Sequence, residues 1–105
     1  MSSPAHLQAL ITETRARRGF VTNPVKILVL LTEEIGEIAS EIKRSWSANY
    51  GEFDRHALKD EIADVFVLLA APATRFDIDL ETAVVEKFLD KDGIRKWKKW
   101  KTAVE

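Results

Sequence analysis

The sequence predicts an all-α fold, a single domain of four helices over residues 1–105. Glycine and proline together account for 7 of the 105 residues, against roughly 12% in average proteins. A β-sandwich or barrel needs a turn about every 8–12 residues, so the chain has too few turn residues for many short strands. Hydrophobic residues make up 46% and charged residues 31% of the chain, which is too apolar for intrinsic disorder. No apolar run reaches the roughly 18 residues that a membrane span requires.

The first two helices are expected to begin at the same signal, a polar residue followed by proline. Ser3-Pro4 starts a helix over residues 4–18, because serine caps a helix and proline fits its first turn. Leucine and isoleucine recur there at helical spacing until Gly19, a typical terminator. Asn23-Pro24 repeats the signal ahead of a long apolar-periodic stretch that predicts a second helix over residues 25–46.

The third helix is expected over residues 55–75. The preceding stretch, residues 45–54, is rich in serine, asparagine and glycine and predicts a loop. Asp54 at its end can cap the helix. Pro72 lies near the other end, where its ring and missing N–H are expected to kink or fray the last turn.

The fourth helix is expected over residues 80–92, capped by Asp79 and stopped by Gly93. The connection before it, residues 77–79, is short. The basic tail, residues 94–105, is expected to form either a further short helix or a loose end.

Composition narrows the kinds of site that the chain can build. It has no cysteine and only two histidines, His6 and His56, which excludes disulfides and cysteine-based zinc or iron–sulfur sites. The N-terminus has no basic segment followed by an apolar core, so we expect no signal peptide and a cytoplasmic location. Residues 1–90 hold 10 basic and 15 acidic residues and residues 91–105 hold 6 and 2, so the net charge of −1 conceals an acidic body and a basic tail.

Acidic residues are mixed into the apolar faces of the second and third helices. An α-helix turns about 100° per residue, which places Glu34, Glu37 and Glu41 along one edge of the second helix's apolar stripe. Glu61 falls among aliphatic residues of the third helix, three positions before Asp64. A core-facing carboxylate loses solvation energy unless a partner offsets the loss. The lysines and arginines of the second helix lie on its outer sector, so a partner from elsewhere is expected.

A divalent cation is the partner that this pattern favours. Glu34/Glu37 and Glu61/Asp64 each have the i, i+3 spacing that puts two side chains on one helix face. One such pair says little, because solvated charged helices contain many. Two pairs on consecutive helices, both turned toward the core, are harder to explain in that way, since buried acids are rarely unpaired. With oxygen ligands alone, the expected ion is Mg²⁺, with Mn²⁺ as the alternative.

The same residues form a pattern that resembles a known family. Glu33-Glu34-Ile-Gly-Glu37 matches the signature E-E-x-x-E, and Glu61-Ile-Ala-Asp64 matches E-x-x-D, with 23 residues between the two. This combination, together with its helical context over most of the chain, is similar to the MazG-like nucleotide pyrophosphohydrolases of the all-α NTP pyrophosphatase superfamily. The resemblance implies a MazG-like helical bundle. It also implies that Mg²⁺ is held by Glu34, Glu37, Glu61 and Asp64.

The resemblance further implies roles in catalysis and substrate binding. Glu33 is the candidate for polarising the attacking water, and Glu37 is counted with it as catalytic, although the helical wheel puts Glu33 on the outer sector. Residues of the fourth helix and its continuation hold the substrate's phosphates in the family. Here these are Lys87, Lys91 and Arg95, but Asp90–Asp92 stand where the family's asparagine is expected, and a solvated basic end is the alternative.

Base recognition is assigned to an aromatic residue. Trp46 follows the second helix and could stack on a nucleobase. A place in the core or in an interface is the alternative, because aromatic residues near helix ends serve there too. The preferred base and sugar are not encoded in any motif of the chain.

The reaction implied by the resemblance is Mg²⁺-dependent hydrolysis of NTPs or dNTPs between the α and β phosphates, as house-cleaning of the nucleotide pool. One alternative is a phosphoribosyl-ATP pyrophosphatase, which has similar paired acids. Another is a non-catalytic helical interaction module that retains the fold. Nucleic-acid binding through the Trp-Lys-Lys-Trp-Lys tail is disfavoured, because the acidic body repels a phosphate backbone.

Self-association is the last expectation. A chain of 105 residues buries only a modest part of its surface, and two of its helices carry acids inside their apolar faces. One subunit therefore has little left to enclose a nucleotide. The size and the resemblance both point to a homodimer or a dimer of dimers, with no membrane or nucleic-acid partner.

Overall fold

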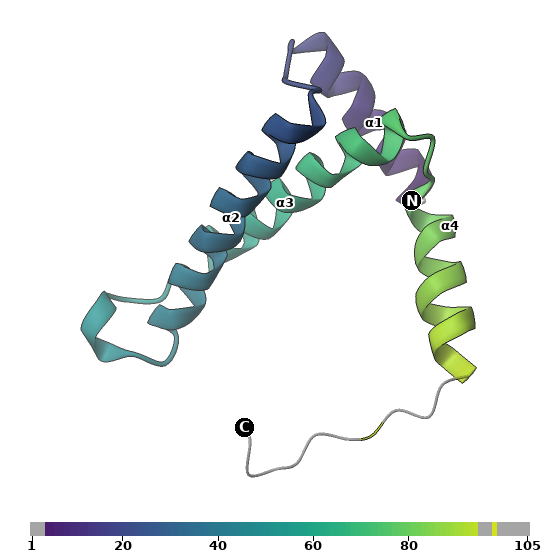
Figure 1. Ribbon diagram of the computed structural model, residues 1–105. Helices are drawn as coiled ribbons and strands as arrows, with labels where there is room; N and C mark the ends of the chain where they lie inside the picture. The colour runs from purple at the N-terminus through teal and green to yellow at the C-terminus, as the bar shows by residue number, and fades with distance from the viewer. Residues whose placement is uncertain (1–3, 95–97, 99–105) are drawn as a thin grey trace.

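The computed structural model describes residues 4–94 and residue 98, and this part of the chain is helical without any strand (Figure 1). The all-α prediction is therefore confirmed. The predicted cap Ser3 and the alternative of a short C-terminal helix lie outside the described residues. The elements, in chain order, are α1 (Pro4–Arg17), α2 (Pro24–Arg44), the 3₁₀ turn η1 (Ala48–Tyr50), α3 (Arg55–Arg75), α4 (Leu80–Val84), the π-helical η2 (Val85–Lys91) and the 3₁₀ turn η3 (Asp92–Ile94).

The helix ends follow the capping signals of the sequence. The Asn23 side chain accepts hydrogen bonds from the backbone N–H groups of Val25 and Lys26 at 3.0 and 3.2 Å. Asp54 caps α3 in the same way, with donors 2.9 and 3.2 Å from its Oδ1 atom. Gly19, two residues after the end of α1, has a φ of +70°, a backbone conformation that glycine adopts without a steric cost. The predicted starts of α2 and α3 and the end of α1 are confirmed.

Two predictions about helix ends are wrong. Of the kink or fray expected at Pro72, the fray is absent, because the Phe76 N–H donates to the Pro72 carbonyl at 3.0 Å and the helix continues to Arg75; the kink stays a prediction. The fourth helix is α-helical only over Leu80–Val84; Asp79 caps it, but the hydrogen bonding then changes to the wider π pattern. Gly93 lies within the 3₁₀ turn η3 rather than stopping the helix. A π segment has no residue signature of its own that would distinguish it from an α-helix.

The α2–α3 pair forms the long arm of the molecule, and α1 packs against the end of α3 (Figure 1). The α4–η2 segment leaves that junction in another direction and contacts α1 at its base. In the part of the chain that the structure describes, η2 does not pack on α2 or α3 to any substantial extent. The fold therefore separates the acidic α2–α3 pair from the α4–η2 segment, which carries Lys87 and Lys91.

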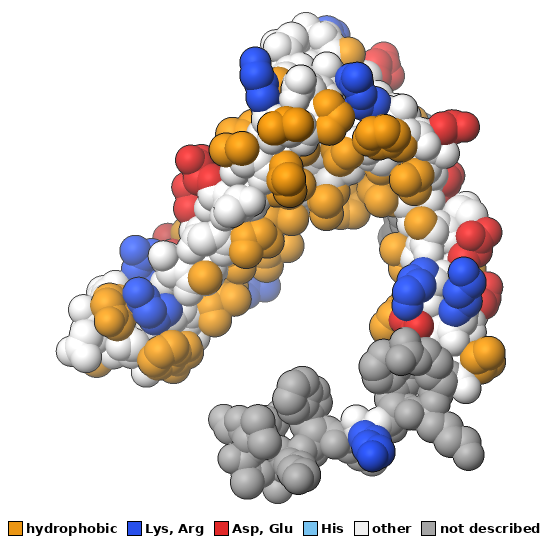
Figure 2. Space-filling view, in the orientation of Figure 1, with side chains coloured by type: hydrophobic (Ala, Val, Ile, Leu, Met, Phe, Trp, Pro, Cys, Tyr) orange, Lys and Arg blue, Asp and Glu red, His pale blue; other side chains and the backbone are white. Residues whose placement is uncertain are grey.

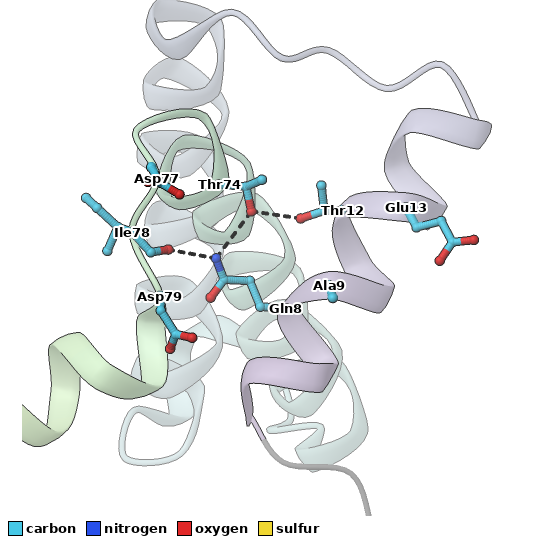
Figure 3. A pocket seen from close by; sticks show the side chains of 8 residues that line it. All are labelled: Gln8, Ala9, Thr12, Glu13, Thr74, Asp77, Ile78 and Asp79. Atoms are coloured by element: carbon cyan, nitrogen blue, oxygen red, sulfur yellow. Dashed lines mark hydrogen bonds between the residues drawn. The ribbon is translucent and has the colours of Figure 1, made fainter.

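Gln8 fixes the direction in which α4 leaves the junction. Its Nε2 atom donates to Thr74 Oγ1 at 3.2 Å and to the Ile78 carbonyl at 2.9 Å (Figure 3). Its Oε1 atom accepts the Leu80 N–H at 2.8 Å, and the hydroxyl groups of Thr12 and Thr74 lie 2.9 Å apart. These groups border a surface pocket of about 430 Å³. Gln8 is buried, and its side-chain amide forms hydrogen bonds with residues on both sides of the α3–α4 turn. These bonds hold α1 and the turn together.

The apolar core of a single chain is small. Ile27, Leu68, Ala70 and Ala73 are the buried apolar residues among those described. Large apolar side chains remain exposed on α2, α3 and η2, including Phe88 at 63%. Figure 2 shows hydrophobic side chains gathered on the side of the α2–α3 pair that faces the α4–η2 segment. None of the described helices combines the length and the apolar character needed to cross a bilayer.

Candidate metal centre

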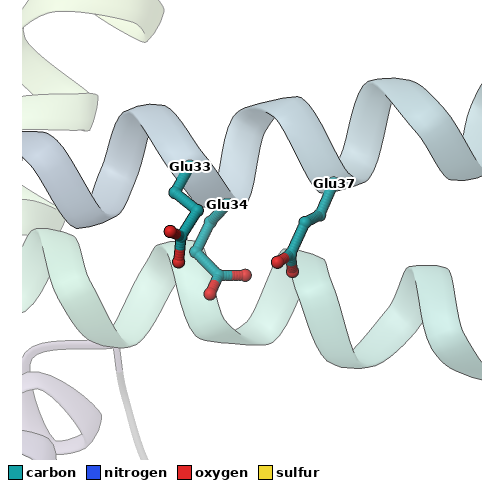
Figure 4. A group of neighbouring side chains, drawn as sticks. All are labelled: Glu33, Glu34 and Glu37. Carbon is teal, nitrogen blue, oxygen red and sulfur yellow. The ribbon is translucent and has the colours of Figure 1, made fainter.

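The packing of α2 against α3 brings five carboxylates into one cluster. Carboxylate oxygens of Glu33, Glu34 and Glu37 lie within 4.8 Å of one another, and so do oxygens of Glu34, Glu61 and Asp64. Glu34 belongs to both groups and joins them. Figure 4 shows the three α2 side chains projecting toward α3. The two pairs that the sequence predicts on consecutive helices are thus brought together in space. The expectation that both pairs turn toward the core is met only in part, because Glu34 and Glu61 are half-buried whereas Glu37 and Asp64 are exposed.

The position of Glu33 differs from the helical-wheel prediction. The wheel puts it on the outer sector of α2, and its side chain is indeed exposed. Its carboxylate nevertheless reaches the oxygens of Glu34 and Glu37 (Figure 4). A wheel places only the Cα–Cβ direction, whereas the rotatable bonds of glutamate can carry the carboxylate around the helix toward its neighbours. Glu33 therefore lies at the solvent side of the cluster.

Crowding of like charges dominates the electrostatics of the site. The pKa of Glu37 is raised above its usual range, first by the hydrogen bond it shares with Glu61 when one of the two is protonated, and then by the charge of Glu61. The pKa of Glu61 is raised chiefly by the corresponding hydrogen bond with Glu34. With all the carboxylates ionised, no donor is available to Glu34 Oε2, which is buried and has no hydrogen-bond partner among the described residues. Neighbouring carboxylates that disfavour each other's ionised form are stabilised by a cation.

The donor set fits a hard divalent cation. Within the described chain, the ion pairs are Glu41–Arg44, Lys59–Asp60 and Lys87–Asp92, so none involves the five clustered acids. The ligands on offer are oxygens alone, with no histidine or cysteine in either group. Mg²⁺ and Mn²⁺ prefer such ligands. The Oε2 atom of Glu34, buried without a hydrogen-bond partner, is the most direct sign that the described residues supply no positive partner to the cluster.

Glu41, the third acid on the same edge of α2, has a different role. It is 6% exposed, accepts from Arg44 Nη1 at 2.7 Å and accepts from the Asp54 N–H at 2.7 Å. It thereby ties the end of α2 to the cap of α3. The expectation that every basic residue of this helix is poorly placed is wrong for Arg44, because arginine three positions on can reach back along the helix.

The predicted substrate-binding residues that the structure describes, Lys87, Lys91 and Trp46, are not beside the cluster in one chain. Lys87 and Lys91 lie on η2, and Lys87 contacts both Asp92 oxygens at 2.7 and 2.8 Å. Trp46 is 73% exposed after the end of α2, nine residues beyond Glu37 and therefore roughly 13 Å further along the helix direction. Arg95 lies outside the described residues. Their proposed contacts with a nucleotide stay predictions.

Sequence reasoning missed one residue at the site. Arg15 of α1 is 6% exposed and lines a cavity of about 180 Å³ together with Glu34 and Asp64. Arg15, Arg17 and Arg18 all lie near the end of the predicted helix, and basic residues there are typical of a solvated helix terminus. Only the packing of α1 on α3 distinguishes Arg15 from its neighbours.

The fold and the cluster define an all-helical protein whose central helix pair presents a carboxylate site suited to a divalent cation. The chain belongs to the family of the MazG nucleotide pyrophosphohydrolase domain, whose family model matches residues 22–98. That range includes all five clustered acids. A curated relative from Bacillus subtilis (strain 168), named "Uncharacterized protein YpjD", is 37% identical over 82 residues, covering 70% of this chain and 70% of its own. No solved structure matches the chain.

Proposed function

We propose that the protein hydrolyses nucleoside triphosphates between the α and β phosphates with Mg²⁺, releasing the monophosphate and pyrophosphate. The observation that carries the proposal is the pair of carboxylate groups that share Glu34 at the α2–α3 interface. Membership of the MazG nucleotide pyrophosphohydrolase family supports the class of reaction. House-cleaning of the nucleotide pool is the cellular role that we propose for it.

Each clustered residue has a role in this proposal. Glu34, Glu37, Glu61 and Asp64 hold the cation, and Glu34 links the two groups of oxygens. A bound Mg²⁺ neutralises charge on the phosphates and makes water a better nucleophile. Glu33 lies at the exposed edge of the cluster, where it accepts a proton from the attacking water. Glu37 adjoins both Glu33 and Glu61, so it helps to orient Glu33 as the general base.

A pyrophosphate-release screen tests the activity. The panel comprises canonical and modified NTPs and dNTPs, with phosphoribosyl-ATP as a separate arm, each with Mg²⁺ and with excess chelator. We expect metal-dependent release from at least one nucleoside triphosphate, absent from Glu61→Gln and retained in Asp60→Asn. Asp60 is the matched control because it neighbours Glu61 but faces Lys59 at 3.8 Å, outside the cluster. Release from none of the nucleotides, or equal release from Glu61→Gln, contradicts the proposal.

We also propose that the functional unit is a homodimer or a dimer of dimers whose subunits share sites. Apolar side chains along α2, α3 and η2 are exposed in one chain, and exposed apolar patches of this kind mark interaction surfaces. Lys87 and Lys91 lie on an arm that does not pack on its own chain's acidic pair. A second copy can bring these lysines to the carboxylates.

Mixed variants test the shared site. Glu61→Gln and Lys87→Gln proteins, each inactive alone, are unfolded together and refolded, and activity is measured with the mass in solution. Because one site of each mixed dimer keeps both residues, about a quarter of the wild-type activity is expected to return. A monomeric mass, or no recovery despite mixed dimers, contradicts the sharing of residues between subunits but leaves the hydrolase proposal standing.

A further inference from the structure

Arg15 is a buried arginine beside the carboxylate cluster. It lies in the last turn of α1, and only 6% of its surface is exposed. Its Nη2 atom donates to the Val21 carbonyl at 2.7 Å, and its guanidinium carbon lies 5.4 Å from the centre of the Phe20 ring. It stands outside the range that matches the family model. The family match therefore assigns it no function.

These contacts leave the positive charge of Arg15 unpaired. Among the described residues, no carboxylate oxygen lies within 4.0 Å of its guanidinium, and its Nε atom is buried without a hydrogen-bond partner. Burial lowers the pKa of Arg15, as expected when a charged group loses solvation. Arginine is almost never buried to this degree without an anionic partner. A guanidinium has five N–H donors, and one backbone carbonyl satisfies a small part of that capacity.

The cavity at Arg15 is also part of the carboxylate site. It measures about 180 Å³ and is lined by Arg15, Leu30, Glu34, Asp64, Val67 and Leu68. That volume corresponds to about six water molecules at the roughly 30 Å³ that each occupies in the liquid, which is enough for a phosphoryl group. Two orphaned groups of opposite charge, Arg15 Nε and Glu34 Oε2, belong to residues that border the same space.

An anion held at a cation-loaded cluster satisfies both residues. Glu34 and Asp64 need a positive partner, and Arg15 needs a negative one. The two charges nevertheless do not pair with each other at ion-pair distance. An arginine fork binds phosphate oxygens through charge-assisted hydrogen bonds. Apolar Leu30, Val67 and Leu68 complete the lining of the pocket.

We propose that Arg15 forms an anion subsite of the metal centre and binds a phosphate group of the ligand held there. The inference rests on the proposed function, because the phosphate is that of the nucleotide or of the pyrophosphate product. The site then has a positive wall supplied by α1, in addition to any lysine that a second subunit brings. Arg15 is a binding residue in this scheme, and the cavity is the place where the phosphate enters.

Two binding titrations without turnover test the subsite, one with Mn²⁺ alone and one with inorganic pyrophosphate in saturating Mg²⁺. Arg15→Gln is expected to weaken pyrophosphate binding about tenfold or more. It should leave Mn²⁺ affinity unchanged or raise it, because a positive charge that repels the cation has been removed. Arg15→Lys keeps the charge without the fork and is expected to fall between. Arg18→Gln, an exposed arginine of the same helix end, is the matched control and should change neither titration.

The two titrations separate a subsite from a structural support. If Arg15→Gln weakens Mn²⁺ and pyrophosphate binding together, Arg15 only supports the packing of α1 and the proposal is overturned. Unchanged pyrophosphate binding in both Arg15 variants, or no binding by the wild-type protein with Mg²⁺, also overturns it. If Arg15→Gln does not fold by circular dichroism, Arg15→Lys decides, with weaker pyrophosphate binding and intact Mn²⁺ affinity as the expected result. A wild-type protein that binds pyrophosphate but hydrolyses no nucleotide refutes the proposed function alone.

Discussion

The middle and the C-terminal end of α2 each hold an acid that has lost part of its solvation, and the two acids differ in how that loss is offset. Glu34 and Glu41 lie seven residues apart on the same edge of one helix, and both are withdrawn from solvent to a considerable degree. Glu41 is paired by an arginine and by a backbone N–H from the next helix. Glu34 has other carboxylates as neighbours and an oxygen without a hydrogen-bond partner in the described part of the chain. A buried acid that the protein pairs itself serves the fold, whereas a cluster that it leaves unpaired is available to a cation.

The largest expected effect comes from neutralising one acid of the cluster. Glu61→Gln or Asp64→Asn should lower metal-dependent turnover by more than about 100-fold, because a ligand to the ion is lost. Without metal, the melting temperature should stay the same or rise, since repulsion among the remaining carboxylates is smaller. Steady-state kinetics and thermal melts in chelator measure both quantities, with Asp60→Asn as the control. Turnover that survives both changes removes these residues from the ligand set.

Adding the metal should stabilise only a protein with an intact cluster. At a Mn²⁺ or Mg²⁺ concentration about 100-fold above its dissociation constant, the wild-type protein should gain about 2.7 kcal/mol in free energy of unfolding. The same gain is expected for Glu41→Ala, whose cluster is unchanged, and little gain for Glu61→Gln. Urea unfolding with and without metal gives the values. An equal gain in Glu61→Gln would place the cation elsewhere on the chain.

Removing Glu41, the acid that the protein pairs itself, should lower the stability of the fold without changing metal binding. Glu41→Ala deletes the acceptor for Arg44 and for the Asp54 N–H, and the expected loss of stability is about 2 kcal/mol, because two hydrogen bonds to a charged and buried group are lost. Mn²⁺ affinity should not change. Urea unfolding and a metal titration on the same sample compare the two. A large loss of Mn²⁺ affinity in the folded variant shows that Glu41 contributes to the metal site.

The parts of the molecule that depend on short-range patterns could be predicted from the sequence. Asn23 and Asp54 cap the helices that they were expected to cap, because a cap involves only the next three residues. The pairs Glu34/Glu37 and Glu61/Asp64 converge because i, i+3 spacing fixes a helix face and the apolar stripes beside these acids pack α2 against α3. The prediction needed no knowledge of loop conformations.

The missed features depend on side-chain reach and on tertiary packing. Arg44 lies on the outer sector of the wheel, yet its long side chain bends back to Glu41. Arg15 is buried whereas Arg17 and Arg18 are exposed, and sequence spacing does not contain its contacts with Phe20 and Val21 or the pocket that it shares with α2 and α3. The π-helical hydrogen bonding of η2 uses residues that would serve equally well in an α-helix.

The smallest expected effect tests whether the metal cluster is independent of the structural contacts where α2 ends and α3 begins. Asp54→Ala removes the side chain that caps α3 but keeps the backbone N–H that Glu41 binds. The expected loss of stability is about 1 kcal/mol, the usual size for an aspartate cap, with unchanged Mn²⁺ affinity. The cluster begins seven residues beyond Asp54, about two turns into α3, so fraying of the first turn should not reach Glu61. Urea unfolding and the Mn²⁺ titration measure both quantities. Weaker Mn²⁺ binding in Asp54→Ala, with the fold intact, means that the structural end of the α2–α3 pair also sets the geometry of the metal centre.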